Sequence, residues 1–164
     1  MVSKCRLLAG VIVVLLVSQL LAVAGCRAPA RRPGGQEPML SLYINETGET
    51  KQLNIEEYSL GVVAAEMEPD WPLNALAAQA ILARTFTMKK IMDGGVKARG
   101  TDASTSVEEF QAYDAAKVND HVRQAVEVTR GQVIKHKGNY INAWFYASGG
   151  SRTASSAVEG LSFD

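Results

Sequence analysis

Cysteine and histidine are scarce in this sequence, and their positions exclude several kinds of site. The two cysteines, Cys5 and Cys26, lie in the N-terminal apolar region, so the rest of the chain can form neither an internal disulfide nor a thiolate metal site. The two histidines are far apart: His121 follows an Asn-Asp pair typical of a helix start, and His136 lies in the turn-forming run KHKGN. Both are expected at the surface, and we predict no metal site and no cofactor.

An excess of charge of either sign is also absent. The 164 residues include 17 basic and 17 acidic side chains, so the chain offers no polybasic surface to a nucleic acid. The length suits one compact domain after a leader and is too short for two sizeable cores. We therefore expect a single domain and no nucleic-acid partner.

Only one long apolar run is present, at the N-terminus. Lys4 and Arg6 precede it, and small residues lead up to Cys26, which is the pattern of an exported leader. The run VAGC, ending at Cys26, resembles the bacterial lipobox, in which the cysteine is diacylated and becomes the new N-terminus. Residues 1–26 are interpreted as a lipoprotein signal peptide with Cys26 as the lipidation site, or alternatively as an uncleaved membrane anchor. Both interpretations place the domain on the extracytoplasmic face of the cell membrane.

Residues 27–38, RAPARRPGGQEP, predict a flexible linker, because prolines, paired glycines and arginines cannot build a core. Its arginines could rest on anionic lipid head groups or simply be solvated. The folded domain is expected to occupy residues 39–164.

Hydrophobic periodicity from residue 39 onward predicts a mixed α+β domain with a helical core and β-hairpins. The run LSLYINETGETKQLN predicts a hairpin with Gly48 in its turn, followed by a helix capped by Asn54 that ends near Met67. The run LNALAAQAILARTFTMKKIM predicts a second helix, and VNDHVRQAVEVTRG predicts a third that ends at Gly131, before a hairpin built on VIKHKGNYINAWFY. Residues 93–121 are expected to be loop-rich and then partly helical.

Glu66 lies where an apolar residue is expected. Ile55, Tyr58, Val62 and Glu66 follow one another at helical spacing, so the carboxylate lies on the apolar stripe of its helix. A carboxylate there loses water, and desolvation favours the neutral, proton-donating form that a general acid needs. The alternative is a glutamate at a helix end with its carboxylate in solvent.

Gln79 and Arg84 are polar interruptions in the alanine-rich second helix. A buried guanidinium needs an acid or several carbonyls, and Glu66 is the natural candidate partner. A structural salt bridge between the two would keep Glu66 ionised and oppose the acid role. Arg84 would serve catalysis better by orienting the site or binding substrate without touching the acid.

Residues 62–86, VVAAEMEPDWPLNALAAQAILARTF, resemble the signature of the sporulation stage II protein D family, also called the amidase-enhancer family. FQAY at 110–113, AVEVTRGQVI at 125–134 and INAWFYASGGSRT at 141–153 resemble further parts of it, so that the resemblance covers about residues 39–160. The chain departs from the usual pattern at Glu68, where the family has proline, and at Tyr146, where it often has histidine. It also lacks the residues with which some members bind zinc.

This resemblance implies a lytic transglycosylase that acts on peptidoglycan glycan strands, with Glu66 as the catalytic residue. Arg84 and Gln79 match positions assigned to substrate positioning or site architecture, and Tyr146 and Ser148 would line the opposite wall as further substrate-binding residues. Trp144 lies in an alternating run, which favours core packing over sugar binding.

Two other interpretations remain open. The chain could be a non-catalytic peptidoglycan-binding lipoprotein that stimulates a cell-wall amidase, or a decayed fragment without function. Family members continue well beyond the position of Asp164, so a C-terminal truncation is also an expectation. Part of the groove and core would then be missing, and activity would fail even with Glu66 present.

Overall fold

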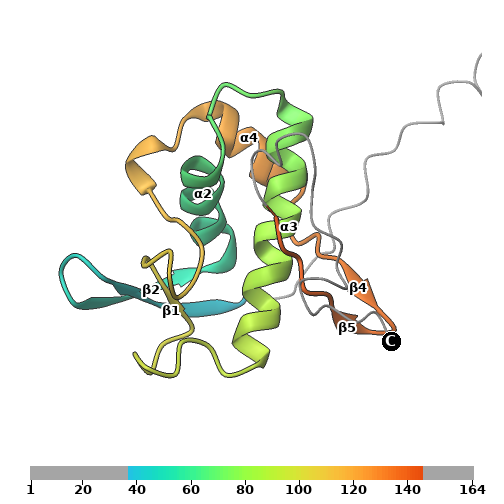
Figure 1. Cartoon of the computed structure of the whole chain (residues 1–164). Helices are drawn as coiled ribbons and strands as arrows, with labels where there is room; N and C mark the ends of the chain where they lie inside the picture. The colour runs from blue at the N-terminus through green and yellow to red at the C-terminus, as the bar shows by residue number, and fades with distance from the viewer. Residues whose placement is uncertain (1–36, 146–164) are drawn as a thin grey trace, which may run out of the picture. The chain divides into compact units, whose positions relative to one another are not determined.

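The computed structural model describes residues 37–145, all of which fall within one compact unit, Glu37–Asp164. The described residues form three α-helices, one 3-10 helix and two small β-sheets. This arrangement confirms the predicted α+β class with a helical core (Figure 1).

The larger sheet has the strand order β2-β1-β3. β1 (Met39–Ile44) and β2 (Glu49–Asn54) form the predicted antiparallel hairpin, and Gly48 occupies its turn with φ +74°. β3 (Ala103–Ser104) pairs in parallel with β1 and lies within the region predicted to be loop and helix. A strand of two residues is too short to show an alternating pattern, which explains why it was not predicted.

The three helices begin and end close to the predicted positions. α2 (Ile55–Glu66) starts at Asn54, whose Oδ1 accepts the N–H of Glu57 at 2.8 Å, and this contact confirms the predicted cap. α3 (Leu73–Met92) follows Pro72, and α4 (Asp120–Val128) ends slightly before Gly131. Figure 1 shows α2 and α3 side by side and joined at one end by a short loop, so the two helices run in opposite directions.

The buried side chains form two clusters on either side of α2. One lies between the sheet, α2 and α3 and includes Leu40, Leu42, Tyr58, Val62 and Phe110. The other joins α2, α3 and α4 through small and branched residues: Val63, Ala64, Leu76, Ala80, Val122, Ala125 and Val126. The alanines on the facing helices permit a close helix approach.

The chain after α4 forms a second hairpin, shorter than predicted. The 3-10 helix η2 (Ala115–Lys117) precedes α4, and β4 (Lys135–His136) pairs with β5 (Asn139–Tyr140) after it. The exposed side chain of His136 agrees with the expected surface position. Within residues 37–145, no helix is both long and apolar enough to cross a bilayer.

Candidate functional site

Glu66 is the last residue of α2. Ile55, Tyr58 and Val62 on the same stripe are buried, whereas Glu66 is partly exposed. Its Oε1 accepts a hydrogen bond from the backbone N–H of Ala112 at 2.8 Å, and no ion pair or second hydrogen bond of this carboxylate occurs within the described residues. The side chain is therefore neither free in bulk water nor sealed in the core, and Oε2 has no partner in this part of the chain.

The amide that binds Glu66 belongs to an irregular stretch, residues 110–114, which we call the FQAYD segment. It crosses α2 at Gly61, whose carbonyl accepts the N–H of Asp114 at 3.0 Å. A Cβ atom on residue 61 would lie 2.3 Å from a ring carbon of Tyr113, so only glycine permits this approach. The Tyr113 ring also stacks on Tyr58, with ring centroids 5.6 Å apart.

The other side of the FQAYD segment is anchored to α3. Gln111 Nε2 donates to Thr87 Oγ1 at 2.8 Å, and both side chains are buried. Phe110 packs edge-on against Tyr58 and Phe86, with ring centroids 6.3 and 5.4 Å away. The segment that holds Glu66 is thus itself held by both helices.

Burial is the main cause of the raised pKa of Tyr58 and of Tyr113. Burial raises the pKa of Tyr58 well above its usual range; Gln111 partly lowers this pKa, whereas Tyr113 and the Glu66 carboxylate raise it further. Among residues 37–145, the Tyr58 hydroxyl has no hydrogen-bond partner. The pKa of Tyr113 is raised by burial and then by the charges of Glu57 and Asp114. Both phenols therefore stay protonated at neutral pH.

Gln79 is a buried polar residue of α3. The residue is 5% exposed, and its Nε2 has no hydrogen-bond partner within the described part of the chain. It shares one line of α3 with Ala83 and Thr87 at four-residue spacing, so it lies on the face that meets the FQAYD segment. Because α2 and α3 run in opposite directions (Figure 1), the N-terminal half of α3, which includes Gln79, lies alongside the C-terminal half of α2, which ends at Glu66. Unsatisfied buried donors are costly and rare, and a functional role is one explanation for them.

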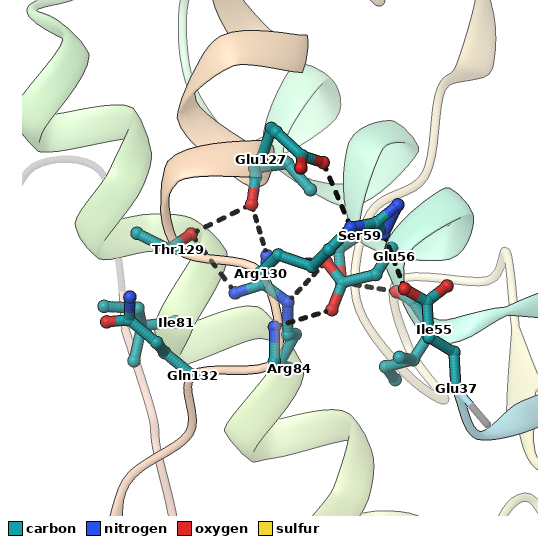
Figure 2. A network of polar contacts seen from close by, with 12 residues as sticks. Glu37, Ile55, Glu56, Ser59, Ile81, Arg84, Glu127, Thr129, Arg130 and Gln132 are labelled. Atoms are coloured by element: carbon teal, nitrogen blue, oxygen red, sulfur yellow. Dashed lines mark hydrogen bonds and ion pairs between the residues drawn. The ribbon is translucent and has the colours of Figure 1, made fainter. Parts of the chain in front are cut away.

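Arg84 has a different partner from the one expected. Its Nη2 and Nε lie 2.7 and 2.9 Å from Glu56 Oε2, and its guanidinium also donates to the Val126 carbonyl and the Thr129 hydroxyl (Figure 2). The candidate salt bridge with Glu66 is therefore wrong, and the alternative expectation, that Arg84 does not contact this acid, agrees with the structure. Glu56 and Glu66 stand at opposite ends of α2, about 15 Å apart along the helix axis, and Arg84 faces the first end. Arg84 is 1% exposed, and its contacts favour the role in site architecture.

The Glu56–Arg84 pair also holds the chain that follows α4. The N–H of Gly131 donates to Glu56 Oε1 at 3.0 Å, and a little further on the N–H of Ile134 donates to Thr85 Oγ1 at 2.9 Å. These contacts fix the start of the β4–β5 hairpin against α3.

Three predicted site residues, Cys26, Tyr146 and Ser148, lie outside the described residues. The expectation for Trp144 is wrong, because its side chain is 54% exposed and β5 ends before it. Across residues 37–145, no group of three His, Cys, Asp or Glu side chains is placed to hold a metal ion.

Comparison with known proteins identifies the family. The Stage II sporulation protein family matches residues 43–136, more than half of the chain, and the chain belongs to this family. It is 36% identical over 96 residues to the amidase enhancer of Bacillus subtilis, covering 58% of this chain and 12% of that protein. Identity is 27% over 143 residues with Stage II sporulation protein D of Bacillus amyloliquefaciens, covering 75% and 42%. An uncharacterized protein of Brachyspira hyodysenteriae is 41% identical over 105 residues, covering 63% and 28%. The chain thus spans less than half the length of each relative.

Three residues that hold Glu66 or Arg84 in place leave little trace in the sequence. Ala112 acts through its backbone, which no side-chain pattern reveals. Thr87 is one of two threonines in α3, and nothing in the sequence distinguishes the two. Glu56 is an acidic residue in the first turn of a helix, where acidic residues are common. The sequence does indicate that a buried Arg84 needs an acidic partner. It does not indicate which carboxylate that partner is.

Proposed function

We propose that this chain is a lytic transglycosylase that cleaves peptidoglycan glycan strands, with peptide-stripped strands as the preferred substrate. The observation that supports this proposal is the state of Glu66: a partly exposed carboxylate on an otherwise buried stripe, bound at Oε1 and without a partner at Oε2 among the described residues. Gln79 Nε2, which has no hydrogen-bond partner among the described residues, is a candidate to bind a sugar substituent.

The proposed reaction needs only one carboxyl group. Glu66 protonates the glycosidic oxygen as the bond from that oxygen to C1 of N-acetylmuramic acid breaks. The C6 hydroxyl of the same sugar then bonds to C1 and returns its proton to Glu66. Hydrolytic glycosidases need a second carboxylate to activate water or to form a covalent bond. Here the sugar ring holds its own nucleophile near C1, so effective concentration replaces the second group.

Incubation of the folded domain with peptide-stripped glycan strands tests the proposal. We expect 1,6-anhydro-muramic ends to appear with the wild type and to be lost in Glu66→Gln, which keeps the shape but not the proton. Glu68→Gln is the matched control, since Glu68 is exposed and two residues away. A wild type that forms no such ends, or a Glu66→Gln variant that still forms them, contradicts the proposal.

A second candidate function follows from the similarity to a protein named amidase enhancer. In this case the chain binds peptidoglycan without cleaving it and stimulates a cell-wall amidase. Sedimentation with purified cell walls and an amidase assay with and without the chain distinguish the two functions. Binding and stimulation without anhydro ends would favour the second function, and a chain with neither property would be a functionless fragment.

We also propose that the domain acts on the outer side of the cell membrane, tethered through Cys26. The pattern of the first 26 residues supports this placement. Metabolic labelling of the full chain with a fatty-acid probe should mark the wild type and not Cys26→Ala. Equal labelling of the two would contradict lipidation at this residue, and an unlabelled chain that stays in the membrane fraction would indicate an uncleaved anchor.

A further inference from the structure

The contact between Glu66 and Ala112 distinguishes the two oxygens of the carboxyl group. A carboxylic acid carries its proton on one oxygen and accepts hydrogen bonds at the other. A backbone N–H can only donate, and the carbonyl oxygen of a carboxylic acid is a better acceptor than its hydroxyl oxygen, so the contact favours protonation at the other oxygen. Oε1 holds that contact at 2.8 Å.

We propose that Oε2 of Glu66 is the oxygen that gives and takes the proton, and that the Thr87–Gln111 hydrogen bond positions the Ala112 amide that enforces this choice. The inference rests on the function proposed above. In it, Oε2–H donates to the glycosidic oxygen as the C1–O bond breaks, and the same oxygen accepts the proton of the C6 hydroxyl as the new C1–O bond forms. Oε1 stays bound to the amide throughout.

Thr87 is a positioning residue in this scheme, because it acts through the FQAYD segment. Its hydroxyl donates to the Ala83 carbonyl at 2.8 Å and accepts from Gln111 Nε2 at 2.8 Å. Gln111 immediately precedes Ala112, so this bond fixes the peptide whose N–H meets Glu66. A small displacement of an aligned catalytic group lowers the rate strongly and need not weaken binding.

The kinetic test compares Thr87→Val with Thr87→Ser on peptide-stripped glycan strands. Valine keeps the shape but removes the acceptor, and we expect kcat to fall about tenfold or more with KM changed less than about twofold. Serine retains the hydroxyl, so Thr87→Ser should keep kcat within about threefold of the wild type.

Thr85→Val is the matched control for a general loss of stability. Thr85 lies two residues earlier on α3, is equally buried, donates to the Ile81 carbonyl at 2.7 Å and accepts from the N–H of Ile134 at 2.9 Å. It therefore has the same pattern of bonds as Thr87, but neither of these bonds joins it to the FQAYD segment. We expect kcat of Thr85→Val to stay within about threefold of the wild type. Equal losses of kcat in the two valine variants would overturn the positioning role of Thr87.

Hydrogen exchange tests the geometry without relying on activity. The Ala112 amide should exchange about tenfold or more faster in Glu66→Ala than in the wild type, because its acceptor is gone. The Asp114 amide, bound to the Gly61 carbonyl, is an internal reference that should not change. An unchanged Ala112 amide overturns the assignment of Oε2 even if the enzyme is active. Conversely, a protected amide in a chain that forms no anhydro ends overturns the proposed function and leaves the contact in place.

Discussion

The close approach of Tyr113 to Gly61 predicts that a glycine-to-alanine substitution in this helix destabilises the protein, although such a substitution ordinarily stabilises a helix. Gly61 lies in the middle of α2, where alanine is ordinarily about 1 kcal/mol more favourable than glycine. Here the new Cβ would lie 2.3, 2.6 and 2.8 Å from three ring atoms of Tyr113. The ring is confined by its stack on Tyr58 and cannot yield without losing that contact. Overpacking of this kind destabilises by about 1–3 kcal/mol, so Gly61→Ala should lower the free energy of unfolding by up to about 2 kcal/mol.

A double-mutant cycle makes the reasoning refutable. In the Tyr113→Ala background the obstructing ring is absent, and Gly61→Ala should now stabilise the protein by about 1 kcal/mol. Urea unfolding of the four proteins at 25 °C gives both values. If Gly61→Ala has the same sign and size in the two backgrounds, the ring does not determine the need for glycine. Gly61→Ala should also reduce the formation of anhydro ends, because the displaced FQAYD segment carries the amide that binds Glu66.

Two further experiments test the buried polar groups. Glu56→Ala should lower the free energy of unfolding by about 3–5 kcal/mol in urea unfolding, because Arg84 stays buried without its acid. Adding Arg84→Met to that variant should restore part of the lost stability. Equal stability of Glu56→Ala and the wild type would refute this prediction. Tyr58→Phe should change stability at pH 7 by less than about 1 kcal/mol, since its hydroxyl has no hydrogen-bond partner in the part of the chain that the structure describes. Burial raises the pKa of Tyr58 above its usual 10.0, so above pH 10 only the unfolded phenol ionises. The wild type should therefore lose about 1.4 kcal/mol more per pH unit than Tyr58→Phe, and parallel pH curves would contradict this.

Local rules were enough to predict the elements that carry Glu66. The Asn54 cap, the spacing of Tyr58 and Val62, and Pro72 before α3 are all local signals, and the helices begin and end close to where these signals place them. The position of Glu66 at the end of a buried stripe followed from helix periodicity alone. What holds its carboxylate did not, because the donor lies 46 residues further along the chain.

The errors have physical causes in long-range packing. The partner of Arg84 depends on how far α3 is shifted along α2. Helical periodicity predicts which face of a helix a residue lies on, but not which residues of the adjacent helix it lies beside. Depending on this shift, Arg84 could lie beside either Glu56 or Glu66. β3 is stabilised by pairing with β1 and not by its own pattern. Trp144 lies in an alternating run, but residues 141–145 form no strand in the described structure.

Holding an acid through the main chain has a consequence for how this protein can change. Any amino acid except proline supplies the same N–H, so we expect residue 112 to tolerate substitution. Its neighbours Gln111 and Tyr113 act through their side chains and should tolerate substitution less. A saturation library across residues 110–114 should thus show a permissive centre flanked by two intolerant positions.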